Sequence, residues 1–246
     1  MPGARPEAPA AIYRVRMLAR QAVAMLWLLA GLAVFAAAAE IWRYVLLLRS
    51  RYGALSSGVV SVSDTFVYTS ASLALAVGVI AGGLTIWWLH VARMAATEVS
   101  GYEPARTNKQ FFWGMLIPGV NLAVAGSVFA ELEHTAERGD PEQRPKPSRM
   151  VKWWWGLWIV DGVLITVTAI WRFRSGVQAQ ADGVVLAAVT DLVGAALAVL
   201  TLLLIRRFVK LLAPIDAANA RLMRVISVAG APAPPLRSSR SFGSVR

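Results

Sequence analysis

Four long apolar stretches dominate this sequence and constrain its fold more than any other feature. They cover residues about 22–48, 65–91, 151–171 and 183–205. The hydrocarbon core of a bilayer is about 30 Å thick, and about 20 apolar residues in an α-helix cross it. A helix also bonds its own backbone polar groups, as lipid requires. The pattern therefore predicts an all-α fold: a polytopic membrane helical bundle with four transmembrane helices.

The composition agrees with this fold and excludes several classes of protein. Of the 246 residues, 57% are hydrophobic and 16% are charged, whereas a soluble domain has about 45–50% apolar and about 25% charged residues. This excludes a soluble enzyme, a secreted disulfide scaffold and a mainly disordered chain. The chain has no cysteine, so disulfides and thiolate metal sites are excluded. Because it has only two histidines, His90 and His134, we expect no metal and no cofactor.

The chain is strongly basic, with 25 Lys and Arg against 14 Asp and Glu and a formal net charge of +11. In a soluble protein this balance would indicate nucleic-acid binding. Cytoplasmic loops of membrane proteins collect Lys and Arg, which explains the charge without nucleic acid. Abundant Arg and Ala are typical of GC-rich bacterial genomes. We therefore expect a multi-pass protein of the bacterial cell (inner) membrane that does not bind nucleic acid.

A fifth apolar stretch, residues about 111–130, is interrupted in its middle. Pro118 and Gly119 break it and Asn121 follows, and proline both lacks a backbone donor and clashes with the preceding turn. The segment is a kinked span, a re-entrant hairpin or an interfacial helix. If it returns to the side it left, 20 basic residues lie on one face of the membrane and 5 on the other; if it crosses, the best split is 16 to 9. The positive-inside rule favours the first arrangement, with both termini cytoplasmic.

The remaining segments are assigned by composition. We expect residues 1–20 to be a cytoplasmic N-terminal segment and residues 21–210 to be the membrane domain. Residues 211–228 resemble a short amphipathic helix on the membrane surface, and residues 229–246 a disordered basic tail. Basic side chains at the end of the last span attract anionic lipid head groups by about 1 kcal/mol each. The residues predicted to make this contact are Arg206, Arg207 and Lys210.

Two carboxylates inside the predicted spans, Asp161 and Asp191, are the strongest candidates for a polar site. An ionised side chain there costs about 2.5–3.5 kcal/mol and usually faces the interior of a bundle. At 1.5 Å per residue, Asp161 lies about 13 Å and Asp191 about 21 Å from the inner edge, so they do not form one close pair. Either they belong to a proton or cation path, or each is a protonated carboxyl bonded to a neighbour. The neighbours considered are Thr166, Thr190, Asn121 and backbone carbonyls.

Three other features have both a functional and a structural interpretation. Asn121 either lines a wet re-entrant tip, as in transporters with broken helices, or caps the helix that starts there. Glu40 and Arg43 are three residues apart on one helix face, which predicts a local ion pair. Gly78 and Gly82 have the spacing of a small-residue contact between membrane helices.

Three motifs lie in the middle of the chain. Residues 87–93 read Trp-Trp-Leu-His-Val-Ala-Arg and residues 113–122 read Trp-Gly-Met-Leu-Ile-Pro-Gly-Val-Asn-Leu. In the third motif, Pro147 precedes Val151, Trp153, Trp154 and Trp158. Over residues about 85–160 the chain thus resembles the bacterial, mainly actinobacterial, membrane proteins grouped as domain of unknown function 4328 (DUF4328). That family often continues with an aromatic residue and then Arg-Pro, where this chain has Ala-Val-Ala. The resemblance implies a membrane fold and no assigned activity.

No catalytic constellation occurs in the sequence, which lacks a nucleophile elbow, a phosphate-binding loop and a His-Glu metal motif. We therefore expect a non-enzymatic protein, a scaffold or modulator subunit of an envelope membrane complex. The glycines of the second span offer a packing face, so we expect a membrane-protein partner or a homo-oligomer. The alternative is a small transporter or channel whose polar route is lined by Asp161, Asp191 and Asn121.

Overall fold

The computed structural model describes residues 8–101, 104–137, 139–140 and 143–212. These residues form six helices and no strand, which confirms the predicted all-α fold. The predicted tail at 229–246 lies outside the described residues, as does the predicted surface helix at 211–228 except for residues 211–212. The helices are α1 (Ala8–Arg49), α2 (Ser57–Ser100), α3 (Asn108–Leu116), α4 (Val120–Ala136), α5 (Arg149–Trp171) and α6 (Val177–Leu212).

Four of these helices, α1, α2, α5 and α6, are long and apolar enough to cross a membrane. They contain the four predicted spans. α1 begins well before the predicted span at 22–48, and α2 extends beyond the span at 65–91 at both ends. Helical backbone bonding continues into the polar flanks, where hydropathy no longer marks the helix.

Local sequence explains where several helices begin and end. Ser56 precedes α2 and its side chain accepts a hydrogen bond from the Val59 N–H, and Ser148 caps α5 in the same way. Such caps satisfy N–H groups that the first helical turn leaves unpaired. Gly101 follows α2 as its C-cap; its N–H bonds the Thr97 carbonyl, and its φ of 77° turns the chain out of the helix. Glycine adopts this left-handed conformation without a steric penalty.

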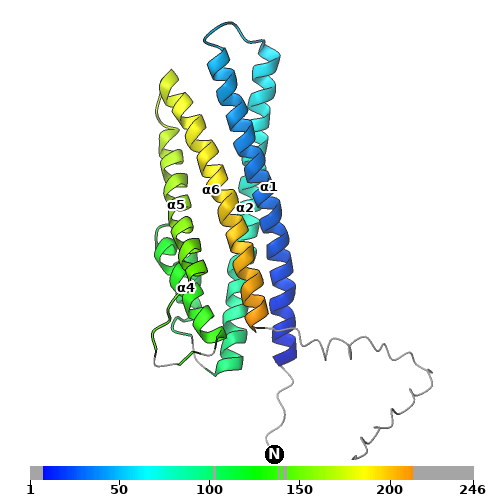
Figure 1. Cartoon of the computed structure of the whole chain (residues 1–246), viewed down its shortest axis with the longest axis vertical. Coiled ribbons are helices and arrows are strands. Elements are labelled where there is room, and N and C mark those ends of the chain that lie inside the picture. Colours follow the sequence, from blue (N-terminus) through cyan, green and yellow to red (C-terminus); the bar gives the residue numbers. More distant parts are fainter. Residues whose placement is uncertain (1–7, 102–103, 138, 141–142, 213–246) are drawn as a thin grey trace, which may run out of the picture. The chain divides into compact units, whose positions relative to one another are not determined.

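The long helices pack side by side in the order α2, α1, α6, α5 (Figure 1). α1 makes the two most extensive interfaces, with α2 and α6, whereas α5 contacts only α6 and α4 among the described helices. Small side chains let membrane helices approach closely. The buried small residues of α1 include Ala22, Ala30, Ala33, Ala36 and Ala37.

We call the end of the bundle at which α1 begins the proximal end, and the end with the α1–α2 and α5–α6 turns the distal end.

Large aromatic side chains join four helices through the bundle core. Phe129 of α4 contacts Phe208 of α6 at 5.8 Å and Trp154 of α5 at 4.5 Å between ring centroids, and Trp88 of α2 lies 6.4 Å from Phe208. Each such pair contributes about 0.5–1.5 kcal/mol beyond its buried area.

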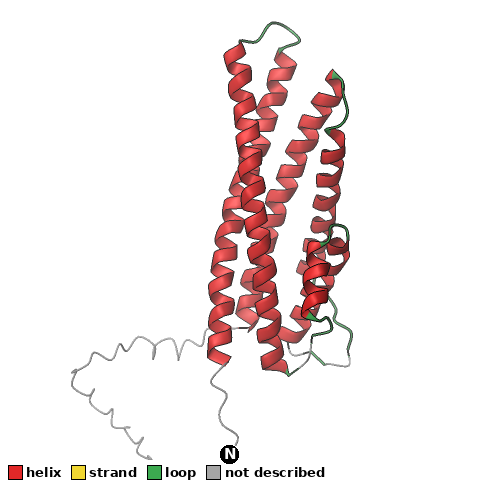
Figure 2. Ribbon diagram, turned by 180° about the vertical axis from the view of Figure 1, so that it is seen from behind, coloured by secondary structure: helices red, strands yellow, loops and turns green. Residues whose placement is uncertain are grey.

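α3 and α4 form a short hairpin that turns at Pro118 and Gly119, where the φ of Gly119 is +84°. The chain passes from the proximal end of α2 into the hairpin, and it passes from the hairpin into α5 at the same end (Figures 1 and 2). The hairpin therefore returns to the side it left. This is the predicted Pro-broken segment, and it does not form a fifth long apolar helix in the part of the chain that is described.

Candidate functional site

The four predicted spans contain three carboxylates, Glu40 of α1, Asp161 of α5 and Asp191 of α6. Glu40 and Asp161 are buried, with 7% and 9% of their surface exposed, and Asp191 is half-buried. Glu40 Oε2 and Asp161 Oδ1 have no hydrogen-bond partner. Leaving a buried polar atom unpaired costs about 1–3 kcal/mol, and nearly all such atoms in proteins are bonded. The two oxygens therefore require an explanation.

Asp161 faces α6 at a glycine. Its Oδ1 lies 3.6 Å from the position that a Cβ atom on Gly194 would take. Gly194 follows Asp191 by three residues, which is about 4.5 Å along the helix. The two aspartates are thus about one turn apart, closer than the difference of about 8 Å expected from residue counts. The counts started at Lys152 and Ile205, and the structure shows that these two residues are not level.

The side chains considered as partners of these aspartates bond elsewhere. Thr166 donates its hydroxyl to the Gly162 carbonyl at 2.8 Å. Thr190 bonds the Leu186 carbonyl and the Thr168 hydroxyl, each at 2.8 Å. A threonine in a helix commonly bonds the carbonyl four residues earlier. The bonds from Asp161 and Asp191 to these threonines, which the structural alternative considered, are therefore not formed.

Glu40 differs from its sequence-based interpretation. The predicted ion pair with Arg43 is not formed, because Arg43 Nη2 pairs with Asp64 Oδ1 of α2 at 3.1 Å. Glu40 instead continues the buried stripe of Ala33, Ala36 and Ala37 on α1. Its place in this i, i+3, i+4, i+7 pattern was the signal that it faces inward. The polar site thus includes Glu40, for which the sequence predicts a local ion pair rather than a site.

Asn121 lies at the tip of the α3–α4 hairpin. The N-cap of α4 is Gly119, without a side-chain cap, so the interpretation of Asn121 as the cap is wrong. The next residue, Leu122, meets α5 beside Asp161: a Cβ atom on Gly162 would lie 2.7 Å from Leu122 Cδ2. Asn121 is half-buried, and no hydrogen bond joins its side chain to Asp161 or Asp191 in the described part of the chain. The structure brings the hairpin tip to α5 near Asp161 without bonding the predicted trio.

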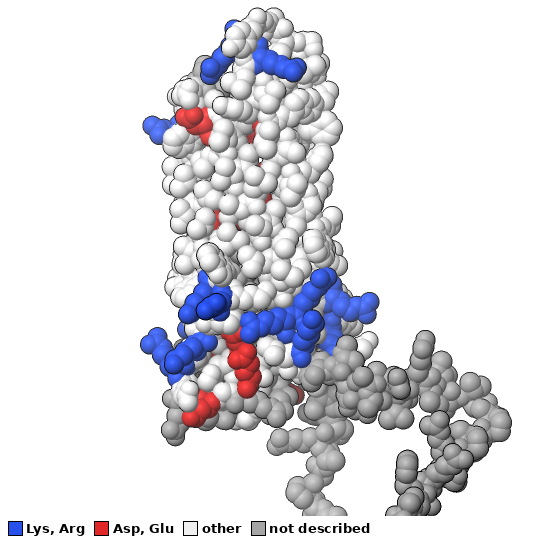
Figure 3. All heavy atoms as spheres, in the orientation of Figure 1, with Lys and Arg blue, Asp and Glu red and all other residues white. Residues whose placement is uncertain are grey.

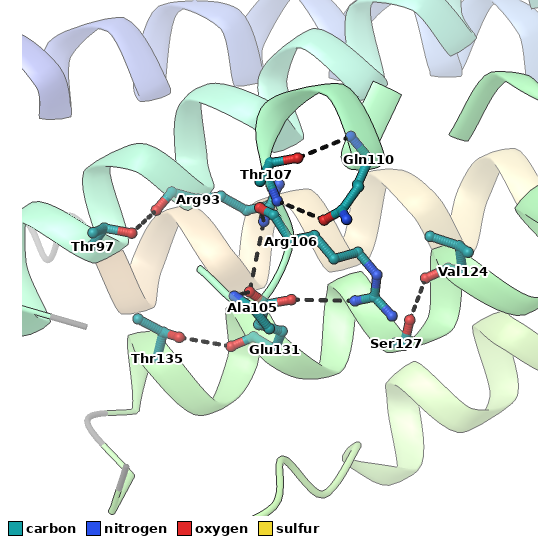
Figure 4. A network of polar contacts seen from close by, with 10 residues as sticks. All are labelled: Arg93, Thr97, Ala105, Arg106, Thr107, Gln110, Val124, Ser127, Glu131 and Thr135. Carbon is teal, nitrogen blue, oxygen red and sulfur yellow. Dashed lines mark hydrogen bonds and ion pairs between the residues drawn. The ribbon is translucent and has the colours of Figure 1, made fainter. Parts of the chain in front are cut away.

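Sequence reasoning missed an ion-pair network near the proximal end. Arg93 of α2, only 4% exposed, donates to the Arg106 carbonyl at 3.1 Å and pairs with Glu131 Oε1 of α4 at 3.6 Å. Arg106 lies 3.5 Å from Glu131 Oε2, and the Ala105 N–H donates to Glu131 Oε1 at 2.8 Å. Figure 4 shows Glu131 beside Arg106 and the backbone at Ala105. The network ties the hairpin to α2.

A second network ties the hairpin to α5 and α6. Arg207 of α6 pairs with Glu133 at 2.6 Å and with Glu137 at 3.3 Å, and it donates to the Ser148 hydroxyl at 2.9 Å. The Ser148 N–H donates to Glu133 Oε2 at 2.8 Å, and Glu133 is only 2% exposed. The sequence does contain a signal for this network: Glu133 and Glu137 lie at the end of an otherwise apolar helix, in a chain with few acidic residues.

This second network bears on the three residues predicted to contact lipid head groups. The Arg207 guanidinium is held by Glu133 and Glu137, whereas Arg206 and Lys210 are exposed. Figure 3 shows that Lys and Arg gather toward the proximal end, below a band of uncharged surface. Lipid contact stays a prediction, and Arg206 and Lys210 are the residues free to make it.

The exposed surface of α2 includes a row of polar and small side chains beside large apolar ones such as Leu75 and Val79. An open groove runs along its distal half, lined by Ser57, Val60, Ser61, Asp64, Thr65, Tyr68 and Thr69. Farther along the helix, Ser72, Gly82 and Gly83 are also exposed. Gly78 packs on Leu29 of α1, where a Cβ atom would lie 3.6 Å away, but Gly82 and Gly83 have no neighbour within 4 Å of that position. The two glycines of the predicted contact therefore do not share one neighbour within the chain.

A family model described as Domain of unknown function (DUF4328) matches residues 51–210. The chain belongs to the DUF4328 family. The match includes α2 to α6 up to residue 210, with Asp161, Asp191 and both ion-pair networks, and it leaves out α1 with Glu40. No curated protein and no solved structure matches the chain. Together with the four long apolar helices, DUF4328 membership fits an integral membrane protein without an assigned activity.

Proposed function

We propose that this protein is a non-enzymatic scaffold subunit of a membrane complex, and that it assembles with a second copy of itself through the exposed face of α2. The observation that carries this proposal is the row of polar and small side chains on that face. In lipid, helices associate through small residues and through bonds between polar side chains rather than through hydrophobic burial.

The contrast with α5 supports this choice of face. The exposed residues of α5 within its predicted span are mostly large and apolar, among them Val160, Val163 and Ile170, and only one hydroxyl, that of Thr166, is exposed there. On α2, Thr65, Thr69 and Ser72 are exposed within the predicted span at 65–91. Lipid tails offer a hydroxyl group no hydrogen-bond partner, so these side chains are better accommodated against a second protein surface.

The chemistry of the α2 face suits a second copy. A hydroxyl both donates and accepts hydrogen bonds, so a row of Ser and Thr can pair with an identical row across a two-fold axis. Thr65 donates to the Ser61 carbonyl at 2.8 Å, which leaves its oxygen free to accept. At Gly82 and Gly83 the backbone of a partner helix can approach closely.

Cysteine crosslinking in native membranes tests this interface, and the chain has no cysteine of its own. A disulfide forms only when the two Cα atoms are about 4.4–6.8 Å apart. We expect Thr65→Cys or Ser72→Cys to give a covalent dimer under mild oxidation, whereas the matched control Val163→Cys on α5 stays monomeric. Equal crosslinking at Val163, or none along α2, would contradict the proposal.

A second variant tests the same interface without crosslinking. Gly83→Leu adds a bulky side chain to the α2 face where the monomer has nothing within 4 Å of the Cβ position. We expect loss of the dimer in nanodiscs with unchanged monomer stability. A dimer that persists in Gly83→Leu would count against this face.

The orientation in the membrane is part of this proposal. The proximal end, with most of the described Lys and Arg residues, is the cytoplasmic side of the bacterial inner membrane by the positive-inside rule. A small transporter or channel is the second candidate, and the observation in its favour is the pair of buried, unpaired carboxylate oxygens on Glu40 and Asp161.

A further inference from the structure

We propose that Glu40, Asp191 and Asp161 form a proton relay along the contacts of α1, α6 and α5. Each residue takes up a proton on a carboxylate oxygen and passes it on, so that the donor becomes a carboxylate again and no other bond changes. The proposal goes beyond the assembly role and does not depend on it.

The first support is the graded position of the three carboxyls. Glu40 lies nine residues, about 14 Å, from the distal end of α1 at Arg49, and Asp191 lies 14 residues, about 21 Å, from the distal start of α6 at Val177. The contact of Asp161 with the Gly194 position places it within about one turn of Asp191. The three groups thus extend from near the distal end of α1 to about the middle of α5 and α6.

The second support is that two of these side chains are more than nine-tenths buried and have unpaired oxygens. Asp161 Oδ1 is directed at α6 beside Gly194, where a larger residue would narrow the space around it. Trp158, three residues earlier on α5, also has a buried Nε1 without a partner. Residues three apart lie on one helix face. An ionisable residue inside a membrane span is by default a candidate functional site.

The charged groups around the relay favour a proton as its cargo. Glu40 lies in the field of Arg43 and Arg172, and Asp191 in the field of Glu40, Arg172 and Asp161. Arg43 is itself paired with Asp64 of α2. The arginines near the distal end repel metal cations but do not prevent a carboxyl from exchanging a proton. Among the described residues no three acidic or histidine side chains are grouped so that they could hold a metal ion.

A flux assay on the full chain tests the relay. The protein is reconstituted into phosphatidylethanolamine–phosphatidylglycerol vesicles that contain a pH-sensitive dye, and a potassium diffusion potential drives protons inward. We expect flux well above that of empty vesicles. Asp161→Asn and Glu40→Gln should each reduce it by about 10²-fold, the lower range for loss of a positioned proton-transfer group.

Two variants serve as controls. Asp182→Asn removes an exposed acid at the distal end of α6 and should leave the flux unchanged. Asp161→Glu keeps the carboxyl and should retain part of the flux. Thermal unfolding and gel filtration of every variant separate loss of the relay from loss of the fold.

A chemical measurement does not depend on flux. A hydrophobic carbodiimide modifies protonated carboxyls that lie in apolar surroundings, and peptide mass spectrometry locates the adduct. We expect adducts on Glu40 and Asp161 and none on Asp64 or Asp182. The proposal is overturned if the wild-type protein conducts no better than empty vesicles, or if well-folded Asp161→Asn and Glu40→Gln conduct as well as it does.

Discussion

At the scale of single residues, neighbouring basic side chains have opposite environments. Arg206 is exposed at the proximal end, whereas Arg207 reaches Glu133, Glu137 and Ser148. Sequence reasoning gave both the same role because both follow the last apolar span. One residue along a helix turns the side chain by about 100°, and this rotation separates a surface charge from an interhelical ion pair.

The first prediction compares these two arginines. Arg207→Ala leaves the carboxylate of Glu133 buried without its cation, and removing one partner of a buried pair costs about 3 kcal/mol. Arg206→Ala at an exposed position should change stability by less than about 0.5 kcal/mol. Unfolding in a mild detergent measures both. If the two variants are equally stable, the Glu133–Arg207 contact does not hold the hairpin.

At the scale of elements, the α3–α4 hairpin is held by close contacts with α5. The Trp155 indole donates to the Leu122 carbonyl at 2.6 Å, and its ring covers Gly126. The ring contact depends on the absence of a side chain at Gly126, and the packing of the Leu122 side chain on α5 depends on its absence at Gly162. The hairpin therefore packs closely against α5. The Arg93–Glu131 and Arg207–Glu133 ion pairs hold its proximal end against α2 and α6.

The second prediction tests this fit with two glycines. A Cβ atom at Gly126 would overlap the Trp155 ring, whereas one at Gly156 on α5 would meet nothing within 4 Å. Gly126→Ala should destabilise the protein by about 1–3 kcal/mol through overpacking. Gly156→Ala should be neutral or stabilise by about 0.5–1 kcal/mol, because alanine favours a helix. The midpoint of thermal unfolding in detergent distinguishes the two signs, and the same sign for both would contradict the fit.

At the scale of the whole molecule, the described chain has two ends of different character. The proximal end combines the hairpin, the ion-pair networks and most of the basic residues, and the distal end carries the two turns between the long helices (Figure 1). Because the hairpin returns to the proximal end, the start of α1 and the end of α6 lie on the same side of the bundle.

The third prediction concerns this topology in cells. Single cysteines at Tyr52, in the exposed turn between α1 and α2, and at Arg144, in the loop before α5, are labelled with a thiol reagent that does not cross membranes. If the hairpin returns to the cytoplasm, Tyr52→Cys reacts in intact cells and Arg144→Cys reacts only after lysis. Labelling of Arg144→Cys from outside would mean that the segment crosses the membrane.

The sequence by itself determined the helical class, the four apolar helices, the break at Pro118 and Gly119 and the family resemblance. These follow from hydropathy, proline geometry and short motifs, which are local properties that can be read along the chain. The sequence also singled out Asp161 and Asp191, because a carboxylate in an apolar run is conspicuous in any arrangement of helices.

Only the tertiary structure decided which side chains meet. It replaced the Glu40–Arg43 pair with Arg43–Asp64, moved Glu40 into the buried site, brought Asp161 to Gly194 and committed Arg207 to Glu133. Such contacts depend on the rotation and relative height of neighbouring helices. Those quantities are set by packing between segments far apart in the chain. A local pattern indicates only that Glu40 faces inward, not which side chain it meets.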